Sequence, residues 1–555
     1  MDALLGPGMA VAPDARASAA CLPLSDRQPG FHPAARAATP AQADTGHPPV
    51  TEVKVGVIDN SSGKLAREGA AGFLGAATSA FMGFVLTVVL ARVLGDTGSG
   101  VILQAIAVFT IVLSLARAGM DSVAVWIMPR LSANDPSKIR GTLAMMFLVT
   151  AACGIVCAIG MIALAPTFAL SGDRHAADVA QAIAAAGWFL PAGALMLVAL
   201  AATRGLGGVL PYVSVGSIAM PSLRTGGVWL VAIAGGSLVA VTVAWAAPVV
   251  IALVAALVVL GFQVRRHERA AGLRGVWRVQ PALRTSVVMY ALPRVLSAGL
   301  EQSILWLGIL IVGFLAGSAS AGVYGGASRL VAAGFIVDTA LRIVVSTRFS
   351  ALLFAKKFAD IEHLYRTAAI WLVLISTPIY VVLAAFAPVV LRLLGPGFEA
   401  GAGVLVILCV GAVLTFTAGN IHSVLLMSGR SGWAAFNKAV VLVINVLGNV
   451  ILVPLIGING AAISWALSML IDAMLAAAEV RHFIGIRIWA PTIAYALVIP
   501  IATFGIPALI LLQTLGETML ALVLTLAIGA ALFLVWCALD RKRLHLTDLV
   551  RFTRA

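Results

Sequence analysis

Charged residues are scarce in this sequence, since Asp, Glu, Lys and Arg make up 11% of its 555 residues and hydrophobic residues make up 61%. A mean hydropathy of +1.04 excludes a soluble globular protein of this length. Apolar runs of about 20 residues, enough for one membrane-spanning helix, occur at residues 141–166, 241–261 and 490–513. Strands of a membrane barrel would be shorter and would alternate. The composition therefore predicts an all-α polytopic membrane protein.

Cysteine and catalytic motifs are scarce as well. The five cysteines form no CxxC pair and the eight histidines are scattered, so neither a disulfide framework nor a metal site is expected. HExxH, GxSxG, P-loop and GxGxxG motifs in the required context do not occur. The short loops after residue 63 leave no room for the aqueous domain of a glycosyltransferase or polymerase. We therefore expect neither an enzyme nor a bound cofactor.

The first 63 residues differ from the rest. Eight of the 24 prolines precede Thr51, and the segment has no apolar run. It is predicted to be a disordered cytoplasmic tail without a secretory signal, or the product of a misplaced start codon.

The remainder is predicted to form about fourteen transmembrane helices. These spans lie near residues 68–92, 101–120, 141–165, 178–200, 209–234, 237–261, 286–315, 321–346, 366–390, 402–428, 433–456, 459–478, 490–513 and 517–539. The expected domains are a first lobe (64–261), a basic cytoplasmic linker (262–285), a second lobe (286–485), two extra spans (486–540) and a cytoplasmic tail (541–555). Each lobe would contain six helices.

Lys and Arg gather in alternate loops, as the bias toward cytoplasmic loops requires. With both termini in the cytoplasm, the loops on the outside hold only Arg92, Arg174 and Arg392. The chain has 37 basic and 23 acidic residues. The topology and the contact with anionic lipid head groups explain this excess of positive charge, so no nucleic-acid partner is expected. The expected location is the bacterial inner membrane.

An internal repeat relates the two lobes. Aligning LARVLGDTGSGVILQA with IVGFLAGSASAGVYGG at an offset of 222 residues pairs Gly95 with Gly317 and Gly100 with Gly322. The offset covers six spans, an even number, so both lobes would have the same orientation in the membrane.

Ionisable residues inside the spans are the candidate functional residues, because burying each in lipid costs roughly 2.5 to 3.5 kcal/mol unless it faces a cavity or a partner. The candidates for a cationic substrate cavity are Arg224, Arg294, Arg329, Arg342 and Lys438. The candidates for ion coupling are Glu301, Asp338 and Asp472. Spacing places Asp338 and Arg342 one turn apart, and depth brings Glu301 near Arg329. Such pairs can also serve only to hold the bundle together.

Several segments resemble the polysaccharide transporter (Wzx-like) branch of the MOP flippase superfamily, which also contains MATE antiporters and lipid II flippases. They are LARVLG, GVYGGASRL, LLGPGFEAGAGVLVILCVGAV and, most specifically, VPLIGINGAAISWALS from Val453. The resemblance covers about residues 65–485 and implies a MATE-like fold.

The resemblance also implies a flippase of polyprenyl-diphosphate-linked oligosaccharide that works by alternating access. Such a protein would be driven by a proton or sodium gradient and would act beside polysaccharide polymerase and export machinery. Three alternatives stay open: a drug or cation antiporter of the MATE type, a lipid II flippase of peptidoglycan synthesis, and a non-transporting scaffold of a polysaccharide assembly complex. The surplus of Arg favours an anionic substrate.

Overall fold

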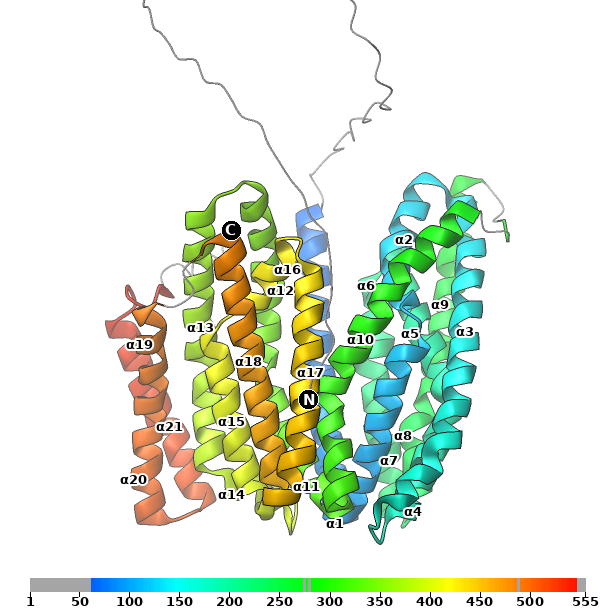
Figure 1. Ribbon diagram of the computed structural model, residues 1–555. Helices are drawn as coiled ribbons and strands as arrows, with labels where there is room; N and C mark the ends of the chain where they lie inside the picture. The colour runs from blue at the N-terminus through cyan, green and yellow to red at the C-terminus, as the bar shows by residue number, and fades with distance from the viewer. Residues whose placement is uncertain (1–60, 273–275, 278–280, 487–489, 547–555) are drawn as a thin grey trace, which may run out of the picture. The chain divides into compact units, whose positions relative to one another are not determined.

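The computed structural model of the chain describes residues 61–272, 276–277, 281–486 and 490–546, and every regular element in these ranges is a helix (Figure 1). Residues 1–60 of the predicted N-terminal tail lie outside the described residues. The last three residues of that predicted tail, 61–63, belong to α1. Residues 547–555 of the second predicted tail also lie outside the described ranges.

The first half of the described chain contains α1 to α9. Its elements are α1 (Ser61–Ala116), α2 (Met120–Asn134), η1 (Pro136–Lys138), α3 (Ile139–Leu164), η2 (Ala165–Ser171), α4 (Ala176–Gly187), α5 (Leu190–Gly205), α6 (Val209–Pro211), η3 (Tyr212–Ala219), α7 (Met220–Ile233), α8 (Leu238–Ala246) and α9 (Pro248–Ala271).

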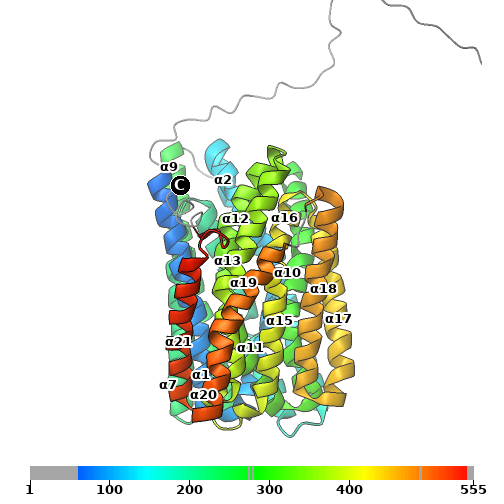
Figure 2. The ribbon, with the colours of Figure 1, turned by 90° about the vertical axis from the view of Figure 1, so that its left-hand side faces the viewer.

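The second half contains α10 to α18, and three more helices follow it. The second half consists of α10 (Pro281–Ala316), α11 (Ser318–Gly334), α12 (Ile336–Phe354), α13 (Phe358–Ala385), α14 (Ala387–Arg392), η4 (Phe398–Gly401), α15 (Ala402–Thr417), α16 (Ile421–Met427), α17 (Ser431–Ile456) and α18 (Ile458–Ile484). The last elements are α19 (Pro491–Pro500), η5 (Ile501–Gly505), α20 (Ile506–Leu515) and α21 (Met519–Leu539). Figures 1 and 2 show α19, α20 and α21 beside α13, at one edge of the bundle.

Eleven helices in the described part are long and apolar enough to cross a membrane, and twelve if the bent pair α4 and α5 is one span. The chain is therefore a multi-pass helical membrane protein. The count is lower than the fourteen expected because it includes only long continuous helices, and three of the predicted spans are not separate helices of this kind. The first two predicted spans are merged in α1, which Gly95 breaks at the boundary between them. Pro211 and Pro221 flank the π-helical η3, which divides the predicted span 209–234.

The turns predicted from the repeat have matching backbones. Gly95 has φ 70° and ψ −171°, and Gly317 has φ 86° and ψ 167°, a region open essentially to glycine alone. The following glycines make reciprocal contacts: a Cβ on Gly100 would lie 1.7 Å from the Ser318 carbonyl oxygen, and a Cβ on Gly322 would lie 2.0 Å from that of Asp96. The offset of 222 residues relates both partners of the first contact to those of the second. Such reciprocity is the pattern of a two-fold axis.

The predicted basic linker is shorter than expected, because α9 continues to Ala271 and α10 begins at Pro281. The helical extension is fixed by an ion pair in which Arg140 Nε lies 2.5 Å from Glu268 Oε1. Beyond α9, the Val276 N–H donates to the Ser137 carbonyl oxygen at 2.8 Å. This segment thus packs against the loop that precedes α3.

Candidate functional site

A cavity of about 480 Å³ lies between α1, α7, α8, α10 and α11. Its lining includes Arg224 from the first half and Arg329 from the second, beside the neutral polar side chains of Gln302, Thr87 and Thr110. No aspartate or glutamate is among the described residues that line it. Two cations without an opposing charge give the cavity a positive potential that attracts anions.

Each of these arginines rests on a tryptophan ring. Cζ of Arg224 lies 4.1 Å from the Trp245 ring centroid, and Cζ of Arg329 lies 3.7 Å from that of Trp306. A guanidinium within about 6 Å of an indole face is attracted to the ring quadrupole. Stacking orients the guanidinium plane while its edge stays able to donate to a ligand. The two rings therefore hold both cations in place without neutralising them.

The guanidinium of Arg224 is short of hydrogen-bond partners. Its Nε is buried and has no acceptor among the described residues. A buried donor that stays unpaired costs about 1 to 3 kcal/mol, and more when it is charged. An anionic ligand in the cavity would supply the missing acceptor.

A second cavity, of about 430 Å³, lies within the second half. Asp338, Arg342 and Asn445 line it, and Arg329 and Trp306 line both this cavity and the first. The stacked pair of Arg329 and Trp306 thus forms a shared wall.

Asp472 organises a separate polar cluster between α16, α17 and α18. Its Oδ2 lies 2.5 Å from Lys438 Nζ and 3.1 Å from His422 Nε2, and the residue is 3% exposed. Lys438, a predicted substrate-binding cation, is therefore paired with Asp472, a predicted coupling residue. His422 was missed because neither its helix nor its spacing relates it to Asp472.

The other predicted residues are more dispersed. Asp338 Oδ2 and Arg342 Nη2 are 4.0 Å apart, as their spacing indicated. Glu301 and Arg294 are exposed, and in the described part of the chain no ion pair joins Glu301 to Arg329 within 4.0 Å. Glu301 does not line the central cavity, whereas Arg329 lies in it against Trp306. Arg294 instead lines a smaller cavity of about 250 Å³ with Arg117 and Arg204.

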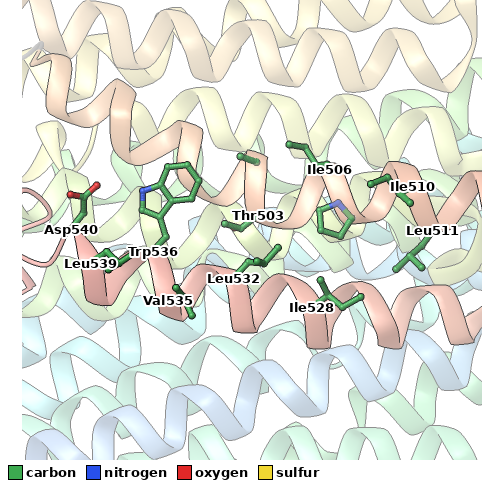
Figure 3. Close-up of a pocket in the computed structure, with 12 residues that line it drawn as sticks. Thr503, Ile506, Ile510, Leu511, Ile528, Leu532, Val535, Trp536, Leu539 and Asp540 are labelled. Carbon is green, nitrogen blue, oxygen red and sulfur yellow. The ribbon is translucent and has the colours of Figure 1, made fainter.

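A larger cavity, of about 710 Å³, lies between η5, α20 and α21 and is almost entirely apolar (Figure 3). Trp536 and Asp540 stand at one end of it, and Ile510 and Leu511 at the other (Figure 3). The Tyr495 hydroxyl donates to Asp540, and Trp536 Nε1 donates to the Tyr495 hydroxyl at 3.0 Å. Its lining suits apolar chains and offers no cation for an anionic group.

A loop aspartate joins the two halves at the turn after Gly317. The Asp173 carboxylate accepts hydrogen bonds from Ser318 N–H at 3.0 Å and from Ser318 Oγ at 2.6 Å. Partial burial raises the pKa of this carboxyl, but the hydrogen bonds from Ser318 outweigh it and hold the pKa below its usual value. Nothing in the sequence relates Asp173 to Ser318, because they are 145 residues apart.

Sequence reasoning also missed Trp245 and Trp306. The aromatic partner of each arginine comes from a neighbouring helix, so no periodicity joins them. A signal was present nonetheless, since tryptophan prefers the membrane interface and both residues fall inside predicted spans.

No protein-family model and no curated protein sequence matches this chain. Solved structures do resemble it. A lipid II flippase, MurJ, in an inward closed conformation has a TM-score of 0.66 and 12% identity, over 87% of this chain and 100% of that chain. An inward-facing MATE multidrug resistance transporter of the MOP superfamily has a TM-score of 0.58 and 16% identity, over 74% and 94%. A eukaryotic MATE transporter, AtDTX14, has a TM-score of 0.51 and 16% identity, over 79% and 98%.

Identities this low show the fold alone. The fold of this chain is similar to the folds of MurJ and of the MATE transporters.

Proposed function

We propose that this chain is a flippase that moves a polyprenyl-diphosphate-linked oligosaccharide across the bacterial inner membrane for polysaccharide biosynthesis. The observation that carries this proposal is the cavity in which Arg224 and Arg329 stand without a carboxylate. A diphosphate diester carries one negative charge on each phosphate, which balances the two guanidinium groups. Arginine suits this task because its planar fork donates to two oxygens at once.

The proposed membrane arrangement has fourteen spans in two six-helix lobes plus two C-terminal helices, with both termini in the cytoplasm. The reciprocal contacts of Gly100 and Gly322 support two related lobes. The distribution of Lys and Arg supports the orientation. In this scheme the cavity between the lobes opens to one leaflet at a time, as in the Wzx-like branch that the sequence resembles.

Ion coupling is assigned to the second half. Asp338 and Asp472 are the proposed proton or sodium sites, and Glu301 is a weaker candidate because it is exposed. Neutralising Asp338 would change the potential at Arg329 through the shared wall. Polymerase and export machinery are the proposed protein partners, since the flipped product must be passed on.

Lipid II is the substrate of the second candidate function. It is also a lipid-linked diphosphate, and the similarity to the MurJ structure covers 87% of this chain. A MATE-type antiporter for cationic drugs fits less well, because both charges in the central cavity are positive and no described carboxylate lines it to balance a cationic substrate.

Reconstituted proteoliposomes test this choice directly. Flipping is measured for a polyprenyl-diphosphate oligosaccharide, for lipid II and for a cationic dye, each with and without proton and sodium gradients. We expect the oligosaccharide lipid to move fastest and the dye not at all. Faster movement of lipid II would select the second candidate, and export of the dye alone would contradict the flippase proposal.

A further inference from the structure

Three arginines meet in the 250 Å³ cavity that Arg294 lines. Arg117 follows the end of α1, Arg204 lies in the last turn of α5, and Arg294 lies on α10. The polar lining also includes Asp121, Ser122 and the phenol groups of Tyr212 and Tyr290. This cavity is distinct from the one that contains Arg224 and Arg329, because the two share no lining residue.

The charges in this cavity are not balanced. Arg117 Nη1 lies 3.0 Å from Asp121 Oδ2, and Asp121 is the single carboxylate in the lining. Arg204 and Arg294 have no carboxylate within 4.0 Å among the described residues. Three arginines and one aspartate leave a net charge of +2. An anion with two charges would neutralise the cavity.

Aromatic rings orient the two unpaired arginines. Cζ of Arg204 lies 5.0 Å from the Tyr212 ring centroid, and Cζ of Arg294 lies 5.8 Å from that of Tyr290. Tyr290 is itself stacked on Trp126, with ring centroids 4.6 Å apart and planes at 8°. Neither phenol hydroxyl has a hydrogen-bond partner in the described part of the chain, so both can donate to a ligand.

Helix α10 lines both cavities, and Arg117 directly follows α1, which lines the central cavity. Arg117 follows Thr110 by seven residues, and Arg294 precedes Gln302 by eight, so each separation is about 10 to 12 Å at the rise of a helix. At this level α10 closely approaches the turn after α1, because a Cβ on Gly119 would lie 2.7 Å from the Ala291 carbonyl oxygen. Both halves therefore build the site, and movement between them would reshape it.

We propose that the cavity of Arg117, Arg204 and Arg294 is a docking site for a lipid-linked diphosphate, occupied before the diphosphate reaches Arg224 and Arg329. This inference rests on the proposed function. The net charge of +2 matches a diphosphate diester, and the free phenol donors add to the guanidinium forks. A short step along α1 and α10 would then bring the diphosphate to the central pair.

Binding of farnesyl diphosphate to the full chain in detergent tests the site. The Arg224→Gln/Arg329→Gln background isolates the docking cavity from the central one. In that background, Arg204→Gln or Arg294→Gln should weaken binding about tenfold, equivalent to about 1.4 kcal/mol, and should reduce its dependence on salt. Arg430→Gln is the matched control, since Arg430 is stacked on Phe483 at 4.6 Å and lines neither cavity.

Flipping kinetics with the central arginines intact provide a second measurement. A docking role predicts that Arg204→Gln and Arg294→Gln raise KM about tenfold and leave kcat within about twofold, because the site acts before translocation. A merely structural role would lower the amount of folded protein and kcat together.

Several outcomes would overturn the docking site. Unchanged binding in Arg204→Gln and Arg294→Gln, equal binding of farnesyl monophosphate, or displacement by phosphatidylglycerol vesicles at equal phosphate would each do so. Equal binding of inorganic pyrophosphate would support it and assign recognition to the diphosphate rather than to the lipid chain. A chain that binds farnesyl diphosphate through Arg204 but flips no lipid would refute the proposed function while leaving this site standing.

Discussion

The two halves of the molecule are alike in their turns and unlike in their charges. Gly95 and Gly317 share a backbone conformation, and the contacts of Gly100 and Gly322 are reciprocal. In the first half Arg224 stands against Trp245, and no carboxylate is among the described residues that line its cavity. In the second half Arg329 borders a further cavity that contains Asp338 and Arg342. In the proposed function both halves therefore contribute to binding the anion, whereas coupling to a proton or sodium ion is assigned to the second half.

The largest expected effect concerns the turns. Gly100→Ala and Gly322→Ala should each cost more than about 3 kcal/mol or prevent folding, because the added Cβ would overlap backbone atoms of the other half. The measurements are folded yield and thermal midpoint in detergent. Gly160→Ala is the control, since nothing lies within 4 Å of its Cβ position. Tolerance of one substitution but not the other would break the equivalence of the two turns.

The next largest effect is expected for the ion pair of Lys438 and Asp472 in the second half. In the first half, Arg224 has no such carboxylate partner among the described residues of its cavity. Asp472→Ala should destabilise the protein by about 3 kcal/mol, because it leaves the Lys438 ammonium without its partner. Lys438→Met/Asp472→Leu should recover most of this loss. The thermal midpoints of the three proteins decide the matter, and a single variant as stable as the parent would show that the pair does not support the fold.

The two central arginines should differ in coupling and not in binding. Arg224→Gln and Arg329→Gln should each slow flipping of a lipid-linked diphosphate about tenfold, which corresponds to about 1.4 kcal/mol. Only Arg329→Gln should also change the response to an imposed proton or sodium gradient, because Arg329 shares a wall with Asp338. An equal change in both variants would remove the distinction between the halves.

The smallest effect is expected where the halves meet at Asp173. Asp173→Asn should cost about 1 kcal/mol at pH 7, because Ser318 loses a charged acceptor and the site is partly exposed. The pKa of Asp173 is lowered by folding, so its stabilisation is present above about pH 4 and is lost as pH falls below that value. The melting curves of the variant and its parent should therefore differ at pH 7 and converge as the pH falls through the lowered pKa of Asp173. A difference that persists at low pH would contradict this assignment.

The sequence was sufficient to predict an all-helical membrane protein, the repeat offset and Arg224 and Arg329 as candidate residues. Lipid excludes unpaired backbone and charge, so hydropathy and buried arginines are strong signals. Which side chains pair with one another could not be predicted from the sequence. Depth along a helix placed Glu301 near Arg329, yet rotation about the helix axis decides which neighbours meet, and Arg329 meets Trp306. Lys438 was predicted to be a cation of the substrate cavity, and its partner Asp472 was not identified because it lies on another helix.

The central claim is that Arg224 and Arg329 together recognise a diphosphate. It is tested most directly by flipping in proteoliposomes that contain either the parent protein or Arg224→Gln/Arg329→Gln, with polyprenyl-diphosphate and polyprenyl-monophosphate sugars as substrates. The account predicts that the parent flips the diphosphate lipid in clear preference to the monophosphate, and that the folded double variant loses about a hundredfold in rate. A folded double variant that flips the diphosphate lipid at the parental rate would contradict it.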